Sequence, residues 1–222
     1  MADPKKETKR ERREEAKQRR LEEIRRRQRK ARMRKLITVA VVALAVVGLV
    51  GGIFFAKVSS NRNKANLAKI AKAGGCEPIE TLPSEGSTHV VPPATVNYKT
   101  NPPTSGNHYA STANTGILSP APQDEYLVHN MEHGHVIFWY KPDLDPTIIT
   151  ALQNIVKKDD RRLILVPRSQ MDTPLAFTSW QHLQTCPSPT SSTPAVAQQF
   201  ADERKAKGPE GTGDAPGVPT GV

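Results

Sequence analysis

The feature that most constrains this chain is a run of 21 residues, 36–56, without a charged side chain (LITVAVVALAVVGLVGGIFFA). A helix rises 1.5 Å per residue, so this run would span about 31 Å, close to the hydrocarbon thickness of a bilayer. A cleaved signal peptide is the alternative, but its apolar part is usually only about 7–15 residues long. Ala56-Lys57-Val58 is also a poor cleavage site. We therefore predict an uncleaved transmembrane helix and a single-pass protein of the cell membrane.

Basic residues lie mainly before this run. Residues 1–35 hold 17 Lys and Arg against 7 Asp and Glu, which accounts for the net charge of +10. Residues 16–35 hold 11 Lys and Arg and residues 57–76 hold 5, so we expect a cytoplasmic amino terminus and an extracytoplasmic carboxyl-terminal domain. No aromatic residue is interleaved with the basic ones, so nucleic-acid binding is not expected. The predicted partner of the tail is anionic inner-leaflet lipid, contacted by Arg25, Arg26, Arg27, Arg29, Lys30, Arg32, Arg34 and Lys35.

Two further features concern association and cross-linking. Gly48 and Gly52 form a G-x-x-x-G pair that would let two helices approach closely, although such pairs also arise by chance in a lone helix. Cys76 and Cys186 bracket the predicted domain. In an oxidising compartment they would form a disulfide, and two free thiols are the alternative. No C-x-x-C motif is present, so a thioredoxin-like redox role has no support.

The carboxyl-terminal half predicts an α+β fold in which one helix packs on a small sheet. Residues 76–123 are rich in Pro, Gly, Ser and Thr and should be mostly loop, with a short strand near residues 89–91. A helix over 124–133 should end at Gly134, and a buried strand should follow over 135–140. The order continues as a helix capped by Asp145, a strand over 163–166 and a strand over 174–180. The predicted parts are therefore residues 1–35 as basic tail, 36–56 as transmembrane helix, 57–75 as linker, 76–186 as β-α-β-β domain, and 187–222 as linker, short helix and disordered tail.

Histidine is concentrated in the loop and helix that precede the first long strand. Four of the six histidines lie between residues 108 and 135, in NPPTSGNH and HNMEHGH. Together with LILVPR, FTSW and KGPE, these segments make residues 70–210 resemble the bacterial membrane-anchored family called domain of unknown function 3105. The resemblance implies a single anchor and an extracytoplasmic domain, but no activity. It carries over His108, His129, Glu132 and His133. The chain departs from the family pattern at Asn107, Met131 and Gln181, where Pro, Leu and Gly are expected, and His135 lies outside that pattern.

These residues suit a metal ion. His129 and His133 are four apart, so a helix places both rings on one face, and His108 could complete a three-histidine site with Glu132 beside it. Such a site would suit Zn or Cu, and Met131 nearby would favour Cu(I). The alternative is that these side chains only hydrogen-bond the loop backbone. His129-x-x-Glu132-His133 also reproduces the H-x-x-E-H signature of inverzincin proteases, but the sequence offers no acidic third ligand in a second long helix.

Two functions from different classes follow. The first is a non-enzymatic interaction or scaffold module of the cell envelope, with an envelope protein as its partner. The second is an extracytoplasmic histidine-based protein that binds Cu or Zn. Phosphate-binding glycine loops and Ser/His/Asp nucleophile motifs are absent, so an enzyme is not the preferred interpretation.

Overall fold

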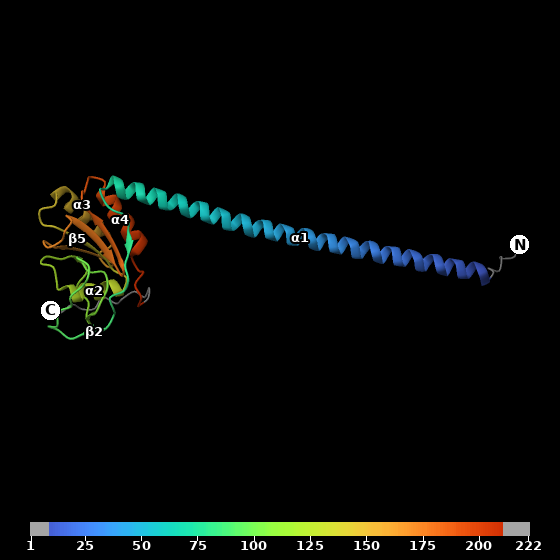
Figure 1. Cartoon of the computed structure of the whole chain (residues 1–222), viewed down its shortest axis with the longest axis horizontal. Helices are drawn as coiled ribbons and strands as arrows, with labels where there is room; N and C mark the ends of the chain where they lie inside the picture. Colours follow the sequence, from blue (N-terminus) through green and yellow to red (C-terminus); the bar gives the residue numbers. More distant parts are fainter. Residues whose placement is uncertain (1–8, 211–222) are drawn as a thin grey trace. The chain divides into compact units, whose positions relative to one another are not determined.

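The computed structural model describes residues 9–210, without the side chains of residues 9–11 and of several positions between 46 and 64. The chain divides into two units, residues 1–63 and 64–222. Helix α1 (Lys9–Ala73) forms the first unit, and its last turns belong to the second (Figure 1). The predicted linker over 57–75 is therefore helical up to Ala73. The predicted disorder of the last dozen residues lies outside the described part of the chain.

The predicted transmembrane helix at residues 36–56 is contradicted. Among the residues described, no helix is long and apolar enough to cross a lipid bilayer. The single-pass topology and the extracytoplasmic placement of the domain depended on that span and are corrected with it.

The predictions on the partners of α1 remain untested. The side chains of the basic segment are exposed, from Arg25 to Lys35. A Cβ atom added at Gly48 or Gly52 would meet nothing within 4 Å. Lipid binding by the basic residues and dimerisation through the glycine pair therefore stay predictions.

The second unit is built on a mixed six-stranded sheet, in the order β1-β8-β7-β5-β6-β4. Strand β5 (Val136–Tyr140), helix α3 (Pro146–Lys158) and the parallel strand β6 (Leu163–Pro167) form a β-α-β unit. Strands β7 (Leu175–Ser179) and β8 (His182–Cys186) continue it as an antiparallel hairpin beside β5. Two short strands complete the edges, β1 (Glu80–Thr81) beside β8 and β4 (Gly116–Ile117) beside β6. The predicted β-α-β-β order is confirmed; β8, β1 and β4 were not predicted.

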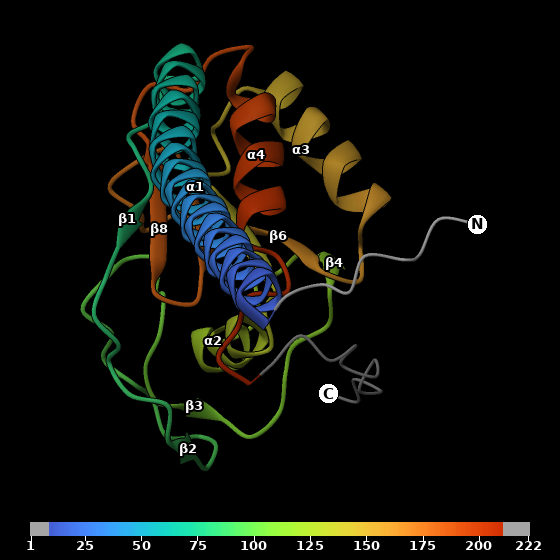
Figure 2. The same ribbon diagram turned by 90° about the vertical axis from the view of Figure 1, so that its right-hand side faces the viewer.

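Helices cover both faces of the sheet, which explains why β5 is hydrophobic throughout. Val136 and Phe138 pack into one core cluster with α3 and with α4 (Thr193–Arg204), and these two helices lie side by side in Figure 2. Ile137 and Trp139 pack into a second cluster with α2 (Asp124–Glu132). Side chains of a strand alternate between its faces, so a strand buried on both sides shows a continuous apolar run. The Asp145 cap predicted for α3 is confirmed, because its carboxylate accepts a hydrogen bond from the backbone nitrogen of Thr147.

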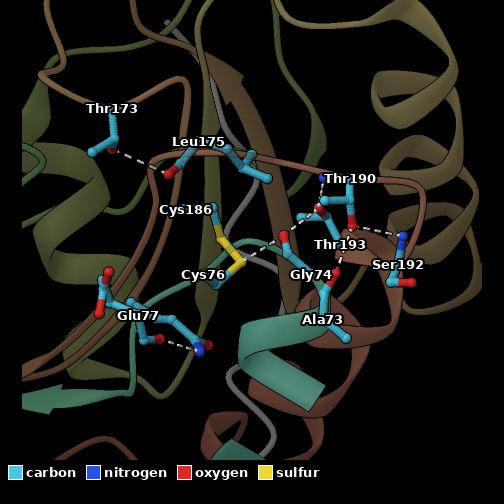
Figure 3. Close-up of a disulfide and its surroundings, with 11 residues drawn as sticks. Ala73, Gly74, Cys76, Glu77, Thr173, Leu175, Cys186, Thr190, Ser192 and Thr193 are labelled. Atoms are coloured by element: carbon cyan, nitrogen blue, oxygen red, sulfur yellow. Dashed lines mark hydrogen bonds between the residues drawn. A yellow bond between two sulfur atoms is a disulfide. The ribbon is translucent and has the colours of Figure 1, made fainter. Parts of the chain in front are cut away.

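Cys76 and Cys186 form the predicted disulfide (Figure 3). It joins the residues that follow α1 to the end of β8. Beside it, Thr193 at the start of α4 donates its hydroxyl hydrogen to the carbonyl oxygen of Gly74 at 2.7 Å. The disulfide thus ties together the two ends of the domain, which are far apart in sequence.

Candidate metal centre

The candidate site lies where α2 ends and β5 begins. The backbone of Gly134 has a φ of +80°, which ends the helix one residue after His133. A Cβ atom on Gly134 would lie 2.8 Å from the Cα of Ala206, so the close approach of the carboxyl-terminal segment also requires glycine. Because the sheet fixes β5, the last turn of α2 and its side chains are held in one place.

His108 reaches this point from the proline-rich segment. Strands β2 (His89–Val90) and β3 (His108–Tyr109) pair in parallel, which sets His89 directly opposite His108. Around β3, Tyr98 donates its hydroxyl hydrogen to the carbonyl oxygen of Asn107 at 2.7 Å, and the Asn107 side chain accepts from the backbone nitrogen of Thr88. Asn107, a departure from the family pattern, therefore helps to hold β2 against β3. In Figure 2, β2 and β3 lie at the same end of the domain as α2.

Four side chains converge here, and we call them the buried histidine site: His89, His108, His129 and Glu132. One ligand atom from each lies within 4.8 Å of all the others. His108 Nε2 is 2.8 Å from Glu132 Oε2, and these side chains are 0% and 4% exposed. His108, more than twenty residues before His129 in sequence, thus does join His129 and Glu132. His89 was not among the predicted site residues and is the exposed member of the set.

Backbone carbonyl groups fix the orientation of two of the rings. Nδ1 of His108 donates to the carbonyl oxygen of Gly106 at 2.8 Å, and Nδ1 of His129 donates to that of Tyr109 at 2.7 Å. In a neutral imidazole only one nitrogen carries a hydrogen, so Nε2 of each ring carries a lone pair, and that of His129 is 2.8 Å from Nε2 of His133. A ring with Nδ1 held by a carbonyl group and a lone pair on Nε2 is typical of metal-ligating histidines.

The contact between His108 and Glu132 is short and buried. Nε2 of His108 and Oε2 of Glu132 are both buried and lie 2.8 Å apart, so the two side chains form an ion pair when His108 carries a second proton. Two electron-rich atoms at this distance repel one another unless a positive charge lies between or beside them. Either a proton on His108 or a cation bound by both atoms would relieve the repulsion.

Burial shifts the protonation of the site. It lowers the pKa of His129 from 6.5 to about 4, opposed by the hydrogen bond to Tyr109 and assisted by the neighbouring histidines. Burial also raises the pKa of Glu132, and the nearby His108 partly counteracts this rise. His129 is therefore neutral at neutral pH, as a metal ligand must be.

The remaining predicted residues lie beside this site or outside it. His133 Nε2 is 2.8 Å from His129 Nε2 and 3.6 Å from Glu210 Oε2. His129, His133 and Glu210 form a second group whose ligand atoms all lie within 4.8 Å of one another. Met131 is fully buried in the core cluster of α2, so its thioether gives no support to Cu(I). His135 is buried, its Nδ1 donates to the carbonyl oxygen of Asn130, and it belongs to neither group among the residues described.

The H-x-x-E-H segment is divided between the two groups. Its Glu132 is held against His108 with almost no exposure, so it has no access to a substrate at the surface. Glu210 is the acidic member of the group with His129 and His133 and was not revealed by the sequence, but it lies after α4 and not in a second long helix. This geometry favours a ligand role for Glu132 over that of a general base.

Comparison with known proteins gives one match. A family model described as "Protein of unknown function (DUF3105)" matches residues 89–216, which include every member of both groups. No curated protein and no solved structure matches the chain. At one departure from the family pattern, Gln181, the backbone has a φ of +61°, where the glycine expected there would be free of strain.

Proposed function

The chain belongs to the domain of unknown function 3105 family, and we propose that its buried histidine site binds a divalent transition-metal ion. The observation that supports this most strongly is the convergence of one ligand atom each from His89, His108, His129 and Glu132 within 4.8 Å of one another. Nε2 of His108 and Oε2 of Glu132 are buried 2.8 Å apart, and leaving such atoms without a positive charge costs about 1–3 kcal/mol each. A metal ion would satisfy both atoms at once.

The ligand set indicates which ions fit. Three imidazole nitrogens and one carboxylate oxygen suit Zn²⁺ and Cu²⁺, whereas Mg²⁺ and Ca²⁺ prefer oxygen ligands alone. With ligand distances of about 2.0–2.1 Å, ligand atoms around one zinc ion lie within about 4 Å of one another, and the site needs only a small contraction to reach this. We propose Zn²⁺ as the ion and Cu²⁺ as its main competitor.

Isothermal titration calorimetry on the full chain tests the proposal. We expect Zn²⁺ to bind with a stoichiometry of one, and His108→Asn to weaken binding by roughly 100-fold or more. His182→Asn is the matched control. Its Nδ1 also donates to a backbone carbonyl oxygen, that of Trp180, but it lies outside both groups. Equal affinity in wild type and His108→Asn would refute the site, and absence of any heat of binding for Zn²⁺ and Cu²⁺ would refute the function.

A non-enzymatic interaction module is the second candidate, because the same histidines hold the loop backbone. His108 and His129 tie Gly106 and Tyr109 in place through Nδ1. If the rings served only this purpose, His108→Asn would destabilise the domain to the same extent with and without Zn²⁺. Thermal unfolding of the titrated samples therefore separates the two functions.

A further inference from the structure

The second group, which we call the outer site, consists of His129, His133 and Glu210. The three side chains differ in how much of their surface is exposed to solvent. The side chain of Glu210 is 48% exposed and that of His133 is 29% exposed, whereas His129 is buried. An ion arriving from solvent can therefore contact Glu210 and His133 without displacing any buried group.

His129 belongs to both sites through a single atom. Its Nδ1 is occupied by the carbonyl oxygen of Tyr109, so only Nε2 can bind an ion. That nitrogen has one lone pair and can coordinate one ion at a time. The two sites therefore exclude each other at His129, and an ion held by the outer site can be transferred to the buried one by a small shift across this nitrogen.

The carboxyl-terminal segment places Glu210 at the outer site. The backbone nitrogen of Ala206 donates to the carbonyl oxygen of Gly134 at 2.7 Å, and that of Glu210 donates to the carbonyl oxygen of Glu132 at 3.3 Å. Between these two bonds, a Cβ atom on Gly208 would overlap the backbone of Glu132 and Gly134. The segment K-G-P-E is thus fitted to the end of α2, and this fit brings an acidic side chain next to His133.

We propose that the outer site is a loading site, at which Glu210 and His133 capture a divalent transition-metal ion and pass it through His129 to the buried histidine site. This inference rests on the proposed function. A carboxylate at the rim of a site raises the local concentration of cations and the rate of their arrival. Because the path of entry is also the path of exit, the loading site speeds release by the same factor and leaves the equilibrium affinity unchanged.

Stopped-flow mixing of the full chain with Co²⁺, a spectroscopic substitute for Zn²⁺, tests the loading role. Trp180 provides an intrinsic fluorescence signal, since its ring centre lies 6.1 Å from that of His108. We expect Glu210→Gln and His133→Asn each to slow association about tenfold. We also expect dissociation to slow equally, and the affinity for Co²⁺ to stay within about twofold of wild type.

Two control variants complete the design. Glu80→Gln makes the same charge change on an exposed residue of β1 and should leave both rates as in wild type. His108→Asn should instead abolish tight binding. If Glu210→Gln and His133→Asn lower the affinity as His108→Asn does, both residues are resident ligands and the loading role is refuted; unchanged rates refute it as well. If wild type itself binds no Co²⁺, Zn²⁺ or Cu²⁺, the proposed function has failed and the loading role with it.

Discussion

Replacement of Glu132 by Gln should have opposite effects on the metal-free and metal-bound protein. The carboxyl group is 4% exposed and 2.8 Å from His108 Nε2, and burial raises its pKa. A carboxyl group with a raised pKa stabilises the folded state at low pH, and this contribution is lost as the pH rises through the folded value. At neutral pH the ionised group therefore costs stability. Glutamine has the same shape, carries no charge and can donate an N–H to His108.

The expected magnitudes follow from the cost of burying the ionised carboxylate. Each unsatisfied buried polar atom costs about 1–3 kcal/mol, so we expect the metal-free variant to be more stable than wild type by about 1–2 kcal/mol. For a domain of this size that raises Tm by about 2–8 °C. With Zn²⁺ at about 1,000 times the wild-type Kd, wild type gains about 4.1 kcal/mol, whereas a variant that binds 100-fold more weakly gains about 1.4 kcal/mol. The order of stability should therefore reverse when zinc is added.

Urea unfolding with and without Zn²⁺ measures both effects. Glu125→Gln is the control, because Glu125 is also buried in α2 but its Oε1 accepts a conventional hydrogen bond from the backbone nitrogen of Val96 at 2.7 Å. We expect this control to lose about 1 kcal/mol irrespective of zinc. If Glu132→Gln instead destabilises the metal-free protein by about 3–5 kcal/mol, His108 and Glu132 form a structural ion pair and the reasoning is wrong.

Three other changes have defined outcomes. Burial lowers the pKa of His129 to about 4, so between about pH 6.5 and 4 the folded protein binds fewer protons than the unfolded chain. As the pH falls through this range, the unfolding free energy of metal-free wild type should drop by up to about 3 kcal/mol, and that of His129→Gln should drop by less, as measured by urea unfolding. Gly208→Ala should displace the K-G-P-E segment from α2 and slow Co²⁺ loading as Glu210→Gln does, and loading at the wild-type rate would contradict the placement of Glu210. Cys76→Ser opens a loop with a sequence separation of 110 and should lower stability by up to about 4–5 kcal/mol, with the same loss in reduced wild type; an unchanged unfolding midpoint would show that the disulfide is not formed in solution.

The strand and helix elements of the domain were predictable where the signal is local. Asp145 and Pro146 define the start of α3, and the buried run after Gly134 defines β5, because capping and side-chain periodicity act over a few residues. Strand β8 was missed because its short polar sequence has no such signal, and it is held by pairing with β7. The membrane span predicted from the apolar run at 36–56 was wrong, since no described helix meets the length and apolar character that a membrane span requires.

The residues of the candidate site were likewise predictable only in part from the sequence. The sequence by itself determined that His129 and His133 are neighbours, because the helical repeat places residues four apart on one face, and the histidine pattern also identified His108 and Glu132. Only the tertiary structure decided that His89 belongs with them, through the parallel pairing of β2 and β3, and that Glu210 reaches His133, through the packing of the carboxyl-terminal segment on α2. The physical reason is distance along the chain. Spacing within one helix fixes a geometry, whereas the register of two short strands and the path of a turn depend on the whole packed domain.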